Sequence, residues 1–86
     1  MKLIDGYTPP TPDNLNQLKD ELSYTGNQMA DLAGVASNSQ WRKYTGGKSP
    51  RTMSPHILFF IAAQLALEKN DLKHVLDKMR EIGAQL

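Results

Sequence analysis

The stretch TGNQMADLAGVASNSQWRKY, residues 25–44, decides the fold. Threonine or serine followed three residues later by glutamine occurs at Thr25 and again at Ser37. This spacing is typical of a capping box, which starts a helix. Gly34 between them is the kind of residue that ends a helix in a left-handed conformation. The stretch therefore predicts two short helices joined by a tight turn, the second running from Ser37 to about Thr45.

The apolar residues of this stretch predict which sides of the two helices face the core. Ala30 is small enough to lie where the helices cross, and Val35 is expected to fill the space beneath the turn. Trp41 and Tyr44 share one face of the second helix at i, i+3 spacing. We interpret this aromatic pair as an anchor to the core, in preference to Trp41 stacking on a base.

The rest of the chain predicts three further helices and no strand. Thr11-Pro12 is a cap followed by proline, and the leucines after it predict a helix from Pro12 to Ser23. Ser54-Pro55 repeats the device, and the helix to about Lys69 is apolar on nearly all sides, so it is expected to be the most buried element. Asn70 is expected to cap a last helix. The predicted fold class is all-α with five helices around a central helix-turn-helix.

Length and composition exclude several classes of protein. A chain of 86 residues forms one domain, and the absence of cysteine excludes disulfides, thiolate metal sites and thiol nucleophiles. The N-terminus lacks the apolar stretch of a signal peptide, and no segment is long enough to cross a bilayer, so we expect a cytoplasmic protein. His56 and His74 lack acidic partners at metal-site spacing. We expect neither a cofactor nor catalysis.

Positive charge is concentrated in the middle of the chain. Residues 1–24 sum to −2, residues 57–86 to zero, and residues 25–56 to +3. A polyanion is therefore attracted to the middle segment, although a charge run of this kind is also consistent with a solvated loop. The polar side chains on the outward side of the second motif helix are those that contact base edges and phosphates. They are Asn38, Ser39, Gln40, Arg42 and Lys43.

Residues 25–35, followed by a polar short helix with an aromatic near its end, a Gly-Gly loop and an apolar helix, resemble the XRE type of helix-turn-helix. The resemblance covers about residues 12–68 and implies a fold like that of the lambda repressor and Cro. It also implies sequence-specific binding of double-stranded DNA by a homodimer that represses transcription, with the second motif helix in the major groove. By position, residues 37–43, from Ser37 onward, resemble recognition-helix residues. Thr25 with Asn27 or Gln28 resembles a set of phosphate contacts.

The chain departs from the family pattern in two places. The family commonly has a branched aliphatic residue where Gln40 falls and an aromatic one where Lys43 falls, whereas here the aromatics come one residue later. A turn lengthened by one residue at Ala36 restores the register and changes which residues face DNA. Gly26 stands where the family often has glutamine, so one phosphate contact is expected to be missing.

Several features have two interpretations at this stage. Lys48 and Arg51 follow the recognition helix and are either a clamp on the DNA backbone or part of a solvated loop. The C-terminal segment 70–86 has apolar residues at 3-4-3-4 spacing, which is typical either of a dimer seam or of a helix packed on its own core; we favour the dimer. The arm, residues 1–11, has no assigned role.

Two functions follow from these patterns. The first is a bacterial or phage transcriptional repressor whose DNA-binding domain spans residues 12–69. The alternative is a helical protein–protein interaction module, antitoxin-like or an adaptor, that binds no specific DNA sequence.

Overall fold

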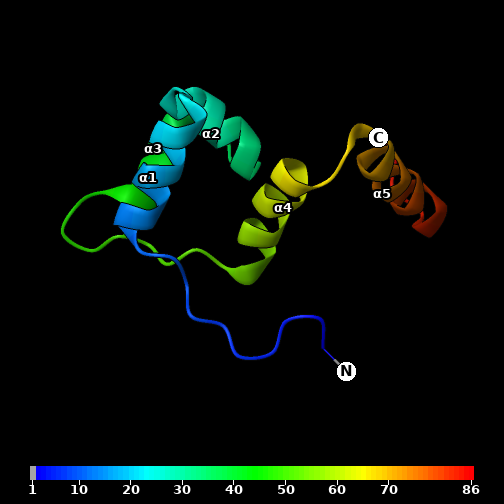
Figure 1. The fold of residues 1–86 in the computed structure, drawn as a ribbon, viewed down its shortest axis with the longest axis horizontal. Coiled ribbons are helices and arrows are strands. Elements are labelled where there is room, and N and C mark those ends of the chain that lie inside the picture. The colour runs from blue at the N-terminus through cyan, green and yellow to red at the C-terminus, as the bar shows by residue number, and fades with distance from the viewer. Residues whose placement is uncertain (1) are drawn as a thin grey trace.

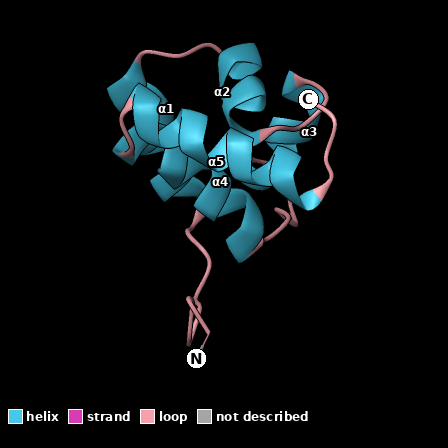
Figure 2. Ribbon diagram, turned by 90° about the vertical axis from the view of Figure 1, so that its right-hand side faces the viewer, coloured by secondary structure: helices cyan, strands magenta, loops and turns pink. Residues whose placement is uncertain are grey.

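The computed structural model describes residues 2–86, which contain five helices and no strand. The expected all-α class is therefore confirmed over this part of the chain (Figures 1 and 2). The helices are α1 (Pro12–Leu22), α2 (Gly26–Ala33), α3 (Asn38–Thr45), α4 (Pro55–Ala66) and α5 (Lys69–Ile82). None of the helices within residues 2–86 combines the length and apolarity needed to cross a bilayer.

Local side-chain bonds account for where α1, α2 and α4 begin. The Thr25 hydroxyl accepts a hydrogen bond from the Gln28 amide at 3.2 Å, and the Thr25 amide donates to Gln28 Oε1 at 2.8 Å. Thr11 forms the same reciprocal box at the start of α1, and the Ser54 hydroxyl caps α4. These bonds satisfy amides that a helix leaves unpaired in its first turn.

Two of the predicted caps are wrong. The Ser37 side chain makes no capping hydrogen bond, although its carbonyl accepts from the Trp41 amide at 3.1 Å. Asn70 does not cap α5, because Glu68 occupies the N-cap position without a side-chain bond. No side-chain bond caps the start of either helix, and Ser37, Glu68 and Asn70 are all exposed to water.

The turn between α2 and α3 spans residues 34–37. Gly34 has φ +72°, and the Val35 amide donates to the Ala30 carbonyl at 3.0 Å, which closes the end of α2. A side chain at Gly34 would be strained by this left-handed conformation. Val35 is half-buried beneath the turn, as expected.

The core lies among α1, α2, α3 and the inner side of α4. Its largest fully buried side chains are Trp41, Met29, Met53 and Ile61. α2 contacts both α3 and α4, while α1 contacts α3. Gln64 fastens α4 to the end of α2 by donating from Nε2 to the Leu32 carbonyl at 2.8 Å. The helix pair α2–α3 is thus held between α1 and α4.

α4 is not the most buried element, contrary to expectation. Only Ile61 is buried in it, and Phe59 and Phe60 are about half exposed at 51% and 49%. The helix also ends at Ala66, short of the predicted Lys69. An apolar helix needs neighbours on every side to be central, and α4 packs on the body through one side only.

α5 stands apart from the four-helix body (Figure 1). None of its residues is buried, and two extended residues, Leu67 and Glu68, lead the chain away from α4. The possibility that this helix folds back on its own core is therefore not realised in the structure.

The arm before α1 runs out from the body (Figure 2), and one of its side chains bonds to the segment before α4. The Tyr7 hydroxyl donates to the Met53 carbonyl at 2.7 Å. Burial raises the pKa of this phenol above its ordinary value. The bond links the arm to the segment that enters α4.

Candidate nucleic-acid interface

α3 is anchored by the two aromatic residues predicted for that role. Trp41 is 1% exposed and Tyr44 5%, and their ring centroids lie 6.5 Å apart at an interplanar angle of 53°. The two rings are tilted toward each other, and aromatic pairs prefer such tilted or edge-to-face arrangements to flat stacking. Because both rings enter the core, the opposite side of α3 must face outward.

The outward side of α3 consists of Ser39, Arg42 and Lys43, all exposed. These three residues, spaced at i, i+3 and i+4, line a shallow hollow of about 350 Å³ with Gly46 and Gly47. The glycines leave the end of the helix uncovered by side chains. The hollow therefore joins two cationic side chains and a hydroxyl on one open surface.

Asn38 and Gln40 are less available than expected. Both are half-buried, and the Asn38 amide group lies directly over Gly26 at the start of α2. Gly26 is thus required by the close approach of α3, which gives a structural reason for glycine at a position where glutamine was the family expectation. Ser37, at the N-cap, is exposed.

The residues predicted as phosphate contacts at the start of α2 differ in whether their side chains already make hydrogen bonds within the protein. Thr25 and Gln28 are exposed, but their side chains are engaged in the capping box. Asn27 is exposed at the first turn. The N-terminal end of a helix attracts anions through its unpaired amides and its dipole, so this end of α2 has the chemistry of a phosphate contact.

α1 adds two residues that the sequence did not indicate. Asn16 and Lys19 line a hollow of about 300 Å³ together with Gly26 of α2 and Asn38 and Arg42 of α3. Asn16 Nδ2 also lies 3.5 Å from the Thr45 carbonyl. A signal was present in the sequence, since each residue follows an inward leucine by one position, but the neighbour of that side of α1 was unknown.

The loop after α3 turns back on the helix (Figure 1). The Arg51 amide donates to the Lys43 carbonyl at 2.7 Å, and Gly47 adopts φ +86° within the loop. Lys48 and Arg51 are both exposed. The backbone bond keeps Arg51 next to the last turn of α3, so this turn and the loop after it carry the exposed cations Lys43, Lys48 and Arg51 close together in the chain.

The cations of this surface have no carboxylate partner within residues 2–86. Both ion pairs of that region lie in α5, where Lys78 meets Glu81 at 3.2 Å and Arg80 meets Asp77 at 3.0 Å. We call the surface formed by Lys19, Arg42, Lys43, Lys48 and Arg51 the basic face. It can bind an anionic ligand without first breaking an internal salt bridge.

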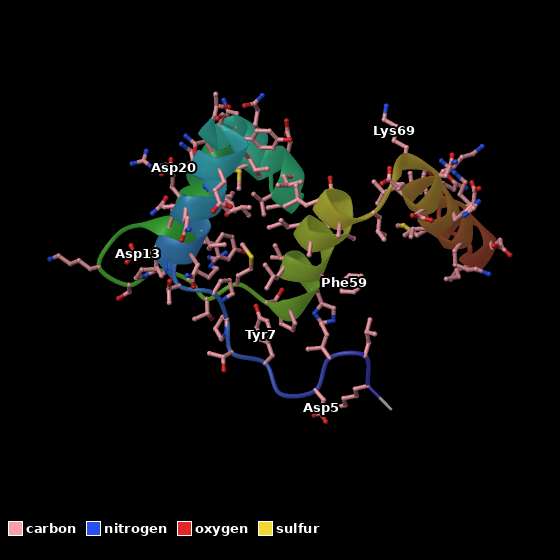
Figure 3. The ribbon with its side chains drawn as sticks, in the orientation of Figure 1. Asp5, Tyr7, Asp13, Asp20, Phe59 and Lys69 are labelled. Carbon is pink, nitrogen blue, oxygen red and sulfur yellow. The ribbon has the colours of Figure 1, made fainter. Side chains whose placement is uncertain are left out.

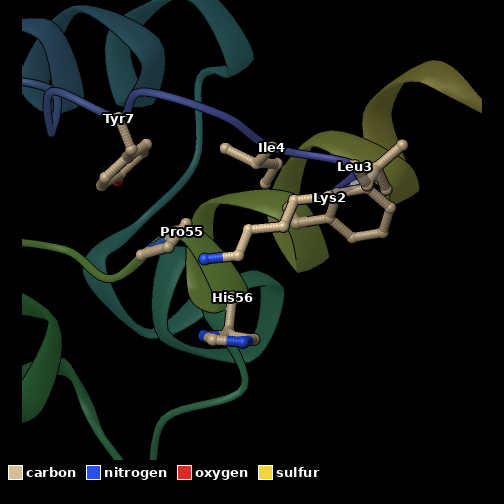
Figure 4. A pocket seen from close by; sticks show the side chains of 7 residues that line it. Lys2, Leu3, Ile4, Tyr7, Pro55 and His56 are labelled. Atoms are coloured by element: carbon tan, nitrogen blue, oxygen red, sulfur yellow. The ribbon is translucent and has the colours of Figure 1, made fainter.

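A separate apolar cleft lies between the arm and α4 (Figure 4). Its volume is about 600 Å³, and its lining includes the apolar or aromatic residues Leu3, Ile4, Tyr7 and Phe59 as well as Lys2 and His56. No group of histidine, aspartate and glutamate suited to a metal ion occurs among residues 2–86. The cleft is lined mainly by apolar side chains, and none of its lining residues belongs to the basic face.

No family model matches the chain, and neither the curated proteins nor the solved structures contain a match.

Proposed function

We propose that this protein binds double-stranded DNA in a sequence-specific manner, with α3 lying in the major groove. The observation that carries the proposal is the division of α3 into a buried aromatic side and an exposed side of Ser39, Arg42 and Lys43. An α-helix with its side chains is about 10–12 Å in diameter, and the major groove, about 12 Å wide, admits a helix of this thickness. α3 is thus the right size and carries the right groups for groove binding.

The exposed side chains have distinct expected roles. Arg42 is in the middle of the exposed side, and a guanidinium can donate two hydrogen bonds to guanine O6 and N7. Lys43 and Ser39 are suited to phosphate oxygens, which position a protein without selecting a sequence. Among Ser39, Arg42 and Lys43, we therefore propose that Arg42 selects the base pair.

Phosphate contacts are expected on both sides of α3. Lys19 with Asn16 and the N-terminal turn of α2 lie beside Arg42, while Lys48 and Arg51 follow the other end of the helix. Each phosphate neutralised by such a cation contributes about 0.9 to the salt dependence of log K. A DNA backbone held at both ends of α3 places that helix between its two strands.

The wider biological role rests on the XRE-type resemblance. We propose a cytoplasmic bacterial or phage repressor that acts as a homodimer and has a binding function without catalysis. A palindromic operator has two half-sites related by two-fold symmetry, and a protein that binds both half-sites needs the same symmetry. We therefore propose that two copies bind together.

The test begins with selection of bound duplexes from a random library, followed by binding titrations at several salt concentrations. Arg42→Ala is expected to weaken binding to the selected site by about 10- to 100-fold and to relax preference at one base pair. Arg80→Ala, in α5, is the matched control and should leave affinity unchanged. Equal effects of the two substitutions, or no enriched sequence, would contradict the proposal.

Lys48→Ala provides an independent check on the loop. Its loss should weaken all duplexes to a similar degree and lower the salt slope by about 0.9, because a phosphate contact carries no sequence information. An unchanged slope would assign Lys48 to solvent.

The second candidate is a helical protein–protein interaction module that binds no specific DNA. The exposed apolar residues of α4 and α5 favour it. A module of this kind would enrich no duplex in the selection, and the Arg42→Ala substitution would leave association with its protein partner intact.

A further inference from the structure

The most unusual surface of the molecule is the apolar side of α5. Val75, Leu76 and Met79 are 47%, 43% and 41% exposed, and Ile82 is 81% exposed. With Leu72 they follow the 3-4 spacing of a helix side that packs on another helix. An isolated helix of 14 residues is marginal in water, so this side needs a partner to be stable.

α4 presents a second unpartnered apolar surface. Phe59 points away from α1 to α3, toward the open side between α5 and the arm (Figure 3). Ala62 and Ala66 follow it at helical spacing and are also exposed, and α4 contains no aspartate, glutamate, lysine or arginine. Small residues beside a large aromatic allow another helix to approach closely. We call Phe59, Ala62 and Ala66 the outer α4 face.

The chain does not bring these two surfaces together. Leu67 has φ −95° and ψ 148°, and Glu68 has φ −73° and ψ 162°, so the connector is extended. α5 therefore leaves the end of α4 without covering the outer α4 face (Figure 1). Each surface is open to a helix from elsewhere, although Phe59 also lines the cleft between α4 and the arm.

The amount of exposed surface indicates how large the partner contact is. The chain exposes 6671 Å², whereas a folded monomer of 9.6 kDa exposes about 5,100 Å². The excess is about 1,600 Å², of which the arm accounts for a part. A standard interface takes about 800 Å² from each partner. An interface of this size would use about half of the excess.

We propose that two copies exchange their C-terminal helices, so that α5 of each chain packs on the outer α4 face of the other. The exchange is reciprocal and closes under a two-fold axis, because each copy supplies one α5 and one acceptor surface. Residues 68–86 carry four basic and four acidic side chains. This neutral segment has no charge preference for a nucleic acid, an anionic membrane or an acidic protein, whereas a second copy meets it without net repulsion.

The helix exchange deepens the homodimer of the proposed function, but its evidence is independent of the basic face. Its test is therefore carried out without DNA. A dimer that binds no duplex would contradict DNA binding and leave the exchange intact, whereas a monomer that selects a duplex would contradict the exchange and the homodimer and leave DNA binding by α3 intact.

The first experiment measures the mass of the full chain by sedimentation equilibrium. We expect twice the 9.6 kDa of the monomer. Val75→Asp should raise the dissociation constant of the dimer at least 100-fold, because each dimer loses two apolar contacts worth about tenfold each. His74→Asp places the same residue on the polar side of α5 and should leave the mass unchanged. A monomeric wild-type chain, or equal effects of the two substitutions, would overturn the proposal.

The second experiment distinguishes exchange from direct pairing of two α5 helices. The chain has no cysteine, so single thiols can be introduced as Ala62→Cys in one sample and Val75→Cys in another. After the two variants are mixed, a short bismaleimide should join one chain of each kind. Cross-linking of Val75→Cys chains only to each other would show α5–α5 pairing and overturn the exchange. Circular dichroism of each variant shows that the four-helix body is retained, which is expected because neither position is buried.

Discussion

Replacing Gly26 by alanine tests the contact that sets α3 against α2. The added Cβ would overlap the amide group of Asn38, so that side chain or α3 itself must shift. Overpacking of this kind costs about 1–3 kcal/mol, while alanine in place of glycine in a helix gains about 0.5–1 kcal/mol. We therefore expect Gly26→Ala to lower the free energy of unfolding by about 1 kcal/mol.

The same substitution made in an Asn38→Ala background should change sign. The overlap is then absent, and alanine should stabilise the protein by about 0.5–1 kcal/mol, so the coupling between the two positions is about 2 kcal/mol. Urea unfolding of the four proteins of this cycle measures it. Gly46→Ala is the matched control and should be nearly neutral, because its Cβ would have only the Arg42 carbonyl oxygen nearby, at 3.8 Å. If Gly26→Ala has the same effect in both backgrounds, the inferred approach of Asn38 to α2 is refuted.

Three further predictions concern the turn, the arm and the anchor of α3. Gly34→Ala should destabilise the protein by about 1–2 kcal/mol in urea unfolding, because an L-residue is strained at φ +72°; no change would mean that the turn relaxes. Burial raises the pKa of Tyr7, so the folded state favours the neutral phenol, and this contribution to stability should be present below pH about 10 and be lost as the pH rises through the folded-state pKa. Tyr7→Phe should remove that alkaline dependence, and an unchanged pH profile would argue against burial of the phenol; loss of the bond to Met53 should cost about 0.5–1.5 kcal/mol at neutral pH. Trp41→Ala should cost about 3–5 kcal/mol in thermal or urea unfolding, and Arg42→Ala less than about 0.5 kcal/mol, because the first side chain is buried and the second exposed; similar losses would contradict the orientation of α3.

The residues of the basic face differ in how far the sequence alone could place them on one surface. Arg42 and Lys43 could be assigned to it from the sequence, because their spacing from Trp41 places them on the other side of one helix. Lys19 could not, since its place beside Arg42 depends on how α1 packs on α3, 23 positions further along the chain. Two of the five polar residues predicted for α3, Asn38 and Gln40, are half-buried, and Asn38 lies against Gly26 of α2.

Features set by a few adjacent residues could be predicted from the sequence. The Thr11, Thr25 and Ser54 caps, the left-handed Gly34 and the inward aromatic pair of α3 all depend on interactions within one turn of helix, and the structure confirms them.

Only the tertiary structure decided how the apolar sides of α4 and α5 are used. Their apolar residues predict that both helices pack against a partner. They do not identify that partner, because the hydrophobic effect is non-directional. The extended connector at Leu67 and Glu68 separates the two helices and leaves Phe59 and Val75 exposed. Helix positions follow from short-range bonds, whereas partners depend on the path of the whole chain.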